Sequence, residues 1–190
     1  MERGMFDLDR FVEGCCQAVT EGEARQATRE RLTLALEAPR AVLAALGEPD
    51  HAGVRTLYRS DELTILDVVW GPRMVLLPHD HRMWAVIGIY TGREDNILWQ
   101  RVPDAPAGRI EARGATSIGA GEILPLGHDA IHSVINPLDR MTGALHVYGG
   151  DFFAQARSEW EPERLEERPY DLERNLRRFE ESNRRLAAGP

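Results

Sequence analysis

The chain has 190 residues, of which 43% are hydrophobic and 28% are charged, a composition typical of one soluble globular domain. Its 31 acidic and 23 basic residues give a formal net charge of −8, which argues against a nucleic-acid partner because phosphate binding needs a basic face. No apolar run approaches the roughly 20 residues of a membrane span, and the acidic start lacks a signal-peptide profile, so we expect a cytoplasmic protein with no membrane partner.

Residues 1–50 are predicted to be helical, because apolar side chains recur there at intervals of three and four residues. The first such stripe consists of Leu8, Phe11, Val12, Cys15 and Val19. Gly47 and Pro49 end this N-terminal helical segment. Cys15 and Cys16 are the only cysteines, and because adjacent cysteines rarely pair, we expect thiols that pack as small hydrophobic groups.

From about Val54 the pattern changes to short β-runs separated by Gly and Pro. The predicted strands are Val54–Arg59, Glu62–Trp70, Arg73–Pro78, Met83–Thr91, Asn96–Val102, Arg109–Ser117, Glu122–Leu126, Ile131–Asn136 and Gly143–Tyr148. The run Arg93–Asn96 is interpreted as a hairpin turn. So many short strands indicate an antiparallel sandwich or barrel, which we place at residues 51–155.

Residues 156–190 are more polar and predict a C-terminal helical extension. Leu172, Leu176, Phe179 and Leu186 form one apolar stripe of an amphipathic helix, whose other side carries ion pairs spaced four residues apart. We expect this helix to pack on the barrel or on a second subunit, so both a monomer and a homodimer fit.

Three histidines lie where neighbouring strands can present them to one metal ion. His79 and His81 are two residues apart, so on a strand they project from the same face. His132 belongs to a later strand that can supply a third ligand, and His128, which has the same parity, is the alternative. Neutral imidazole suits Fe, Zn, Cu and Ni, so the spacing alone leaves the metal open.

Two sequence motifs around these histidines resemble those of the cupin superfamily. The residues that match them are His79, His81 and Gly92 in the first motif, and Pro125, Gly127, His132 and Asn136 in the second. The resemblance implies a mainly β protein, the cupin double-stranded β-helix or jelly-roll barrel, here with N-terminal helices and a C-terminal helix. It also implies one metal ion held by His79, His81 and His132.

The chain departs from the usual first motif at its glutamate, which would fall at Ala85 or Val86. A metal with three neutral ligands and no carboxylate resembles that of the thiol dioxygenases, the cysteine dioxygenase family. The strand that ends at Tyr148 adds to this likeness, because in that family a Ser-x-His-x-Tyr strand places its His and Tyr beside the iron. His146 and Tyr148 match these two positions, and Ala144 stands at the serine.

The resemblance implies an Fe(II) enzyme that uses O2 to oxidise a small thiol, such as cysteine or 3-mercaptopropionate, to its sulfinate. Tyr148 and His146 are the expected catalytic pair. Arg59 is the best match to the arginine with which the family binds a substrate carboxylate, and Arg55, on the same strand face, is the second candidate.

Other interpretations stay open for the same residues. A cupin metalloenzyme that acts on a non-thiol small molecule, and a cupin that only binds a metal or small molecule, would use the same three histidines. His146 and Tyr148 would equally form a buried polar pair without a catalytic role. Arg59 would equally pair with a surface carboxylate, that of Glu62 or Asp67.

Overall fold

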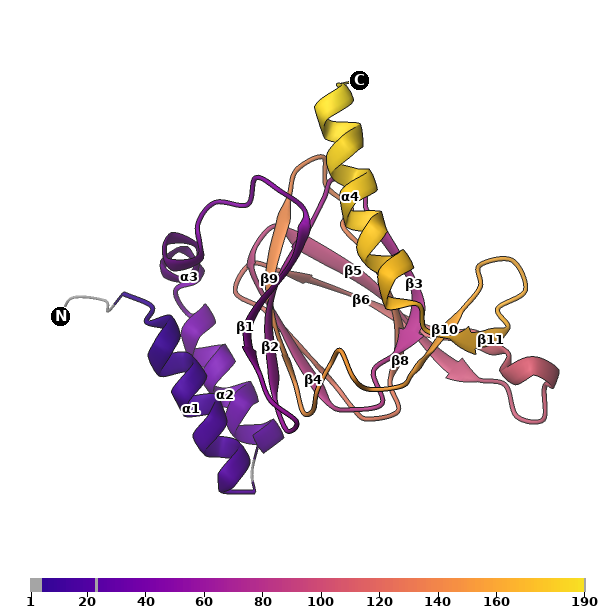
Figure 1. The fold of residues 1–190 in the computed structure, drawn as a ribbon, viewed down its shortest axis with the longest axis horizontal. Helices are drawn as coiled ribbons and strands as arrows, with labels where there is room; N and C mark the ends of the chain where they lie inside the picture. The colour runs from indigo at the N-terminus through magenta and orange to yellow at the C-terminus, as the bar shows by residue number, and fades with distance from the viewer. Residues whose placement is uncertain (1–4, 23, 190) are drawn as a thin grey trace.

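The structure is a computed structural model that describes residues 5–22 and 24–189 (Figure 1). Its helices are α1 (Leu8–Thr20), α2 (Ala24–Leu36), α3 (Pro39–Leu46), the short 3-10 helix η1 (Pro106–Gly108) and α4 (Leu172–Ala188). Its strands are β1 (Gly53–Arg59), β2 (Thr64–Trp70), β3 (Val75–Asp80), β4 (Ala85–Thr91), β5 (Arg93–Arg101), β6 (Ile110–Gly119), β7 (Ile123–Leu126), β8 (Ile131–Ile135), β9 (Thr142–Tyr148), β10 (Ser158–Trp160) and β11 (Glu167–Pro169). Among the described residues, no helix combines the length and the apolar character needed to cross a bilayer.

The strands β2 to β9 form two facing antiparallel sheets. One sheet has the order β2-β9-β4-β7, with β1 at its edge, and the other has the order β3-β8-β5-β6, with β10 and β11 beside β3. Numbered from β2, these orders are 1-8-3-6 and 2-7-4-5, which is the topology of a jelly roll, or double-stranded β-helix. The predicted fold class, mainly β with this barrel and with helices at both ends, is confirmed.

Two predictions about local structure were wrong. The run Arg93–Asn96 is not a turn but the start of β5, and Glu94 and Asn96 are buried. Residues 156–190 contain more than a helix, because β10 and β11 precede α4, and β10 continues the second sheet by pairing with β3. Strands of three residues are too short to show an alternating pattern in the sequence.

The N-terminal helices cover the outer face of the first sheet (Figure 1). Leu32 and Leu36 of α2 are fully buried in a cluster that includes Val86 of β4 and Leu145 of β9. Gly88 of β4 lets this helix approach closely, since a Cβ atom at that position would lie 2.8 Å from Leu32 Cδ2. The helices therefore support the sheet from outside and leave the space between the two sheets free.

The C-terminal helix α4 lies across one opening between the two sheets (Figure 1). The Asp171 side chain caps its first turn by accepting a hydrogen bond from Arg174 N at 2.9 Å. Near the other end, Asn183 exchanges two hydrogen bonds of 2.8 Å with the backbone of Ala52. Between them the Phe179 ring stacks on Trp70 of β2, with 5.3 Å between centroids. The helix is thus attached to the barrel through Phe179 and Asn183.

Candidate metal centre

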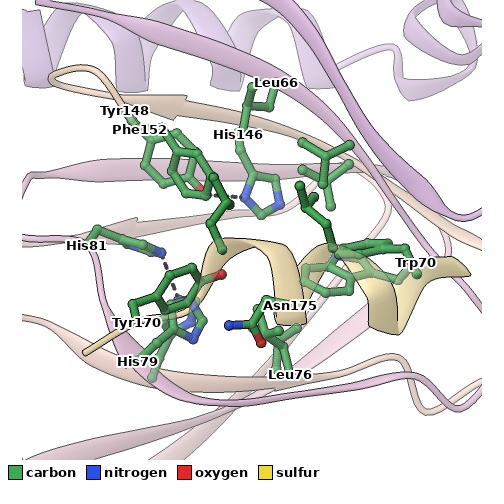
Figure 2. A pocket seen from close by; sticks show the side chains of 17 residues that line it. Leu66, Trp70, Leu76, His79, His81, His146, Tyr148, Phe152, Tyr170 and Asn175 are labelled. Carbon is green, nitrogen blue, oxygen red and sulfur yellow. Dashed lines mark hydrogen bonds between the residues drawn. The ribbon is translucent and has the colours of Figure 1, made fainter. Parts of the chain in front are cut away.

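Three buried histidines meet on the inner side of the second sheet (Figure 2). His79 of β3 lies directly opposite His132 of β8 in the strand ladder, and His81 follows β3 immediately. One ring nitrogen from each lies within 4.8 Å of the others, and His81 Nε2 is 3.4 Å from His132 Nε2. The structure therefore brings together the three predicted ligands. It leaves out His128, which pairs with Asp129 on an exposed loop.

Oxygen acceptors determine the tautomer of two of these rings. His79 Nδ1 lies 2.8 Å from the Leu77 carbonyl oxygen, and His132 Nδ1 lies 2.9 Å from Asn96 Oδ1. A carbonyl oxygen only accepts, so each Nδ1 carries the hydrogen and each Nε2 keeps its lone pair. Metal-binding histidines are oriented in the same way by acceptors on their second nitrogen.

Burial keeps all three rings in the neutral state that binds metals. Desolvation lowers the pKa of His79 to about 4 and holds the pKa values of His81 and His132 well below the ordinary 6.5. For His81 and His132, repulsion from neighbouring histidines lowers the pKa further. The donor set therefore fits a divalent transition metal. In the part of the chain that the structure describes, no carboxylate belongs to this cluster.

A second row of polar groups leads from the cluster into the first sheet. The Tyr148 ring lies 5.0 Å from the His81 ring between centroids, and its hydroxyl is 2.9 Å from His146 Nδ1. On the far side, His146 Nε2 lies 3.6 Å from Oε1 of Glu94, which also accepts a 2.6 Å hydrogen bond from Trp70 Nε1. Glu94 thus stands beside His146 as a polar neighbour that the family resemblance did not indicate.

Glu94 and Asn96 were missed because they fall in the run interpreted as a turn. Burial alternates after Gly92, where Glu94 and Asn96 are buried and Asp95 between them is partly exposed, but residues 93–96 are all polar and the sequence shows no such alternation. Both inward positions are polar, and both contact a histidine. Polar residues are uncommon on the buried face of a strand. Such a residue therefore indicates a site even when it lies outside the two histidine motifs.

The histidine cluster opens into a cavity between the two sheets and α4 (Figure 2). The empty space between its walls, open solvent included, is about 490 Å³, of which the centres of water-sized molecules reach about 40 Å³. Besides the four inner histidines and Tyr148, it is lined by Val54, Leu66, Val68, Trp70, Leu76, Val134, Phe152, Tyr170, Leu172, Asn175, Leu176 and Phe179. Much of the predicted apolar stripe of α4 therefore forms a cavity wall.

The two candidate arginines lie outside this cavity. Arg59 makes a two-pronged ion pair with Asp151, with bonds of 2.9 and 2.8 Å, and its guanidinium lies 5.0 Å from the Phe153 ring centroid. Arg55 pairs with Asp67 at 2.8 Å and also donates to the Leu46 carbonyl oxygen. Neither side chain is among those that line the cavity beside the histidines.

Comparisons with known proteins give no activity for this chain. A scan against models of protein families gives no match. Among solved structures, the chain is similar to an RmlC-like cupin family protein from Methanocaldococcus jannaschii, with 12% identity and a TM-score of 0.45 over 56% of this chain and 86% of that one. An oxalate decarboxylase variant from Bacillus subtilis shows 16% identity and a TM-score of 0.43, over 56% of this chain and 27% of its own. These likenesses are weak, and the assignment to the cupin fold rests on the strand order.

Proposed function

We propose that this protein is a non-haem iron dioxygenase that oxidises a small thiol to its sulfinate with O2. The carrying observation is the set of three neutral imidazole nitrogens without a carboxylate, next to the His146–Tyr148 pair. A neutral ligand set leaves the metal ion with its full positive charge. An anionic thiolate then supplies both charge balance and a polarisable donor.

The proposed reaction adds both oxygen atoms of O2 to one thiolate sulfur and gives a sulfinate, so it needs no further reductant. Fe(II), held by His79, His81 and His132, would supply the redox chemistry when bound. The Nδ1 hydrogen bonds of His79 and His132 keep their Nε2 lone pairs directed at the metal position. Because only three protein ligands would hold the ion, both reactants could bind beside each other, which would give proximity.

The residues around the cluster have two further roles in this proposal. Burial raises the pKa of Tyr148 above its ordinary value, so its phenol keeps the proton and serves as a hydrogen-bond donor. The hydrogen bond to His146 Nδ1 restrains that hydroxyl close to the histidine cluster. The apolar walls of the cavity exclude water, which strengthens these polar interactions.

The test is to load the purified protein with Fe(II) without oxygen, and then to follow O2 uptake with a panel of thiols. We expect one thiol and one O2 to be consumed together, and the product mass to increase by that of two oxygen atoms. His132→Ala should abolish both metal binding and uptake. An iron-loaded protein that takes up no O2 with any thiol would contradict the proposal.

A second candidate is a three-histidine cupin metalloenzyme that acts on a non-thiol small molecule. It is favoured by one observation, the absence of a cationic side chain from the described residues that line the cavity. Metal analysis of the protein as purified separates the two candidates. A tightly bound metal other than iron, together with no thiol-dependent O2 uptake, would support the second.

A further inference from the structure

The cavity beside the histidines has no fixed charge on its walls. Among the described residues that line it, none is Lys, Arg, Asp or Glu. A carboxylate at the free end of a metal-bound thiol would lose its hydration here and gain no cationic side chain as a partner, which is costly. The charge pattern of the cavity therefore selects against thiols that carry a carboxylate.

The apolar walls come mainly from the side opposite the histidines. Leu172, Leu176 and Phe179 of α4 face the interior, together with Val54 and Val68 of the first sheet. Asn183 and Phe179 attach α4 to the barrel, so the apolar side chains of the helix are held in place as one wall of the cavity. A hydrocarbon group that binds here buries apolar surface, at about 25 cal/mol for each Å² removed from water.

Asn175 is the polar residue of α4 among the described residues that line the cavity, and its amide oxygen is an acceptor. Asn175 Nδ2 already donates to Glu159 Oε2 at 2.8 Å and to the Asp171 carbonyl oxygen at 2.9 Å. Its Oδ1 is buried and has no hydrogen-bond partner. A hydroxyl or N–H group on a ligand would satisfy this oxygen, whereas a carboxylate, which only accepts, would not.

The buried Glu94 carboxylate adds a second unfavourable group for an anion at the other side of the cavity. It lies behind Trp70 and His146, and its Oε2 has no hydrogen-bond partner.

The nearest buried cation, Arg157, is held behind the cavity wall. Its guanidinium lies 4.2 Å from the ring centroids of Phe152 and of Tyr170, two residues whose rings line the cavity. Its Nη1 donates to the carbonyl oxygens of Phe152 and Gln155. Arg157 itself is not among the residues that line the cavity, and its buried Nε and Nη2 atoms have no hydrogen-bond partner.

We propose that the substrate is an uncharged, mainly apolar thiol whose hydrocarbon part lies against α4, and not an amino-acid or carboxylic-acid thiol. This inference rests on the proposed function, because it names the class of thiol. Any polar group at the far end of the molecule is a hydrogen-bond donor that faces Asn175 Oδ1.

The test compares two thiols of equal size and branching, 4-methylpentane-1-thiol and 4-mercaptobutanoate. Binding is measured by calorimetry on the Zn(II)-loaded protein, which holds a redox-inactive metal and needs no turnover. We expect the hydrocarbon thiol to bind at least about tenfold more tightly. Equal or tighter binding of the carboxylate thiol would overturn the proposal.

Two substitutions in α4 test whether the thiols bind in the cavity. Leu176→Arg adds a cation to the half-buried wall and should raise the affinity for 4-mercaptobutanoate while lowering that for the hydrocarbon thiol. Leu186→Arg adds the same charge to α4 at a more exposed position outside the cavity, and should leave both affinities unchanged. Equal responses of the two variants would show that the thiols bind elsewhere and would overturn the proposal.

A third variant tests the buried arginine without changing α4. Arg157→Met should leave the preference for the hydrocarbon thiol intact. A selective loss of binding of the carboxylate thiol would show that Arg157 reaches the ligand and would overturn the proposal.

Measurement of O2 uptake by the Fe(II)-loaded protein distinguishes a failure of this inference from a failure of the proposed function. Preferred turnover of carboxylate thiols refutes the inference alone, whereas tight hydrocarbon binding without oxidation of any thiol refutes the proposed function alone.

Discussion

Asn96 shows how one side chain outside the ligand set controls a ligand. Its Oδ1 accepts the hydrogen of His132 Nδ1, which leaves His132 Nε2 as the metal-binding atom. We predict that Asn96→Leu, which keeps the size of the side chain, lowers metal affinity by about 10- to 100-fold. Competition with a chelator measures this change. A variant with wild-type metal affinity would show that Asn96 does not control the tautomer of His132.

Glu94 is a buried carboxylate that has few partners. It accepts a hydrogen bond from Trp70 and faces His146 Nε2, so its charge favours a hydrogen on that nitrogen. Glu94→Gln keeps the shape and an acceptor for Trp70 but removes the charge. We therefore predict unchanged metal content and no loss of thermal stability, with kcat lowered by roughly tenfold or more. A variant with unchanged kcat and an unchanged pH profile would limit Glu94 to a packing role.

The sequence predicts the metal ligands better than it predicts the polar residues that contact the site histidines. His79, His81 and His132 are recognisable because a two-residue spacing and a strand pattern together require a shared face. Asn96 and Glu94 lie on β5, and their contacts with His132 and His146 depend on which strands pair. That pairing is a property of the whole barrel, so local pattern does not reveal it.

Helix α2 and strand β4 pack closely because Gly88 has no side chain. An added Cβ would overlap with Leu32 and Leu36, both of which are fully buried. We predict that Gly88→Ala destabilises the protein by about 1–3 kcal/mol, through overpacking that pushes α2 from the sheet. Urea unfolding measures the change. Gly114→Ala is the control, because nothing lies within 4 Å of a Cβ there, and it should have a smaller effect.

Helix α4 shows what an amphipathic pattern does and does not specify. Its apolar stripe predicts the inward face for Leu172, Leu176 and Phe179 but not for Leu186, which is exposed, and charge pairing predicts the solvent face. The stripe does not reveal that the buried face includes a cavity wall, because the same pattern suits a barrel surface or a second subunit. The contacts that decide between these, Phe179 with Trp70 and Asn183 with Ala52, join segments more than a hundred residues apart.

At the scale of the whole molecule, the jelly roll places ligands from distant segments on one inner surface. The turn residues and alternating runs are enough to predict β1 to β9 but not the three-residue strands β10 and β11, and the two motifs are enough to predict the fold class. The topology then brings β8 between β3 and β5, so that His132 meets His79 on one side and Asn96 on the other. The metal position is therefore a consequence of strand order, and it depends on the folded barrel.

Burial of three neutral histidines also makes the stability of the metal-free protein depend on pH. Their pKa values are lowered from 6.5 by desolvation, that of His79 to about 4, so the unfolded chain binds more protons between these limits. Their contribution to stability is fully present above pH 6.5 and falls as the pH decreases toward 4. Arg101 lowers the pKa of its partner Glu167 from 4.5 to about 2. The stability that Glu167 contributes is therefore lost only at a lower pH, between these two values.

We therefore predict that the Tm of the metal-free protein falls between pH 7 and pH 5, before the carboxylates titrate. Thermal unfolding in the presence of a chelator measures this fall. His81→Gln removes one titrating ring and should make the decrease shallower, whereas His128→Gln, at an exposed loop position, should leave it unchanged. Saturating metal should raise Tm most at neutral pH, because protons and metal compete for the same nitrogens. A Tm that stays constant over this range would contradict the burial of neutral rings.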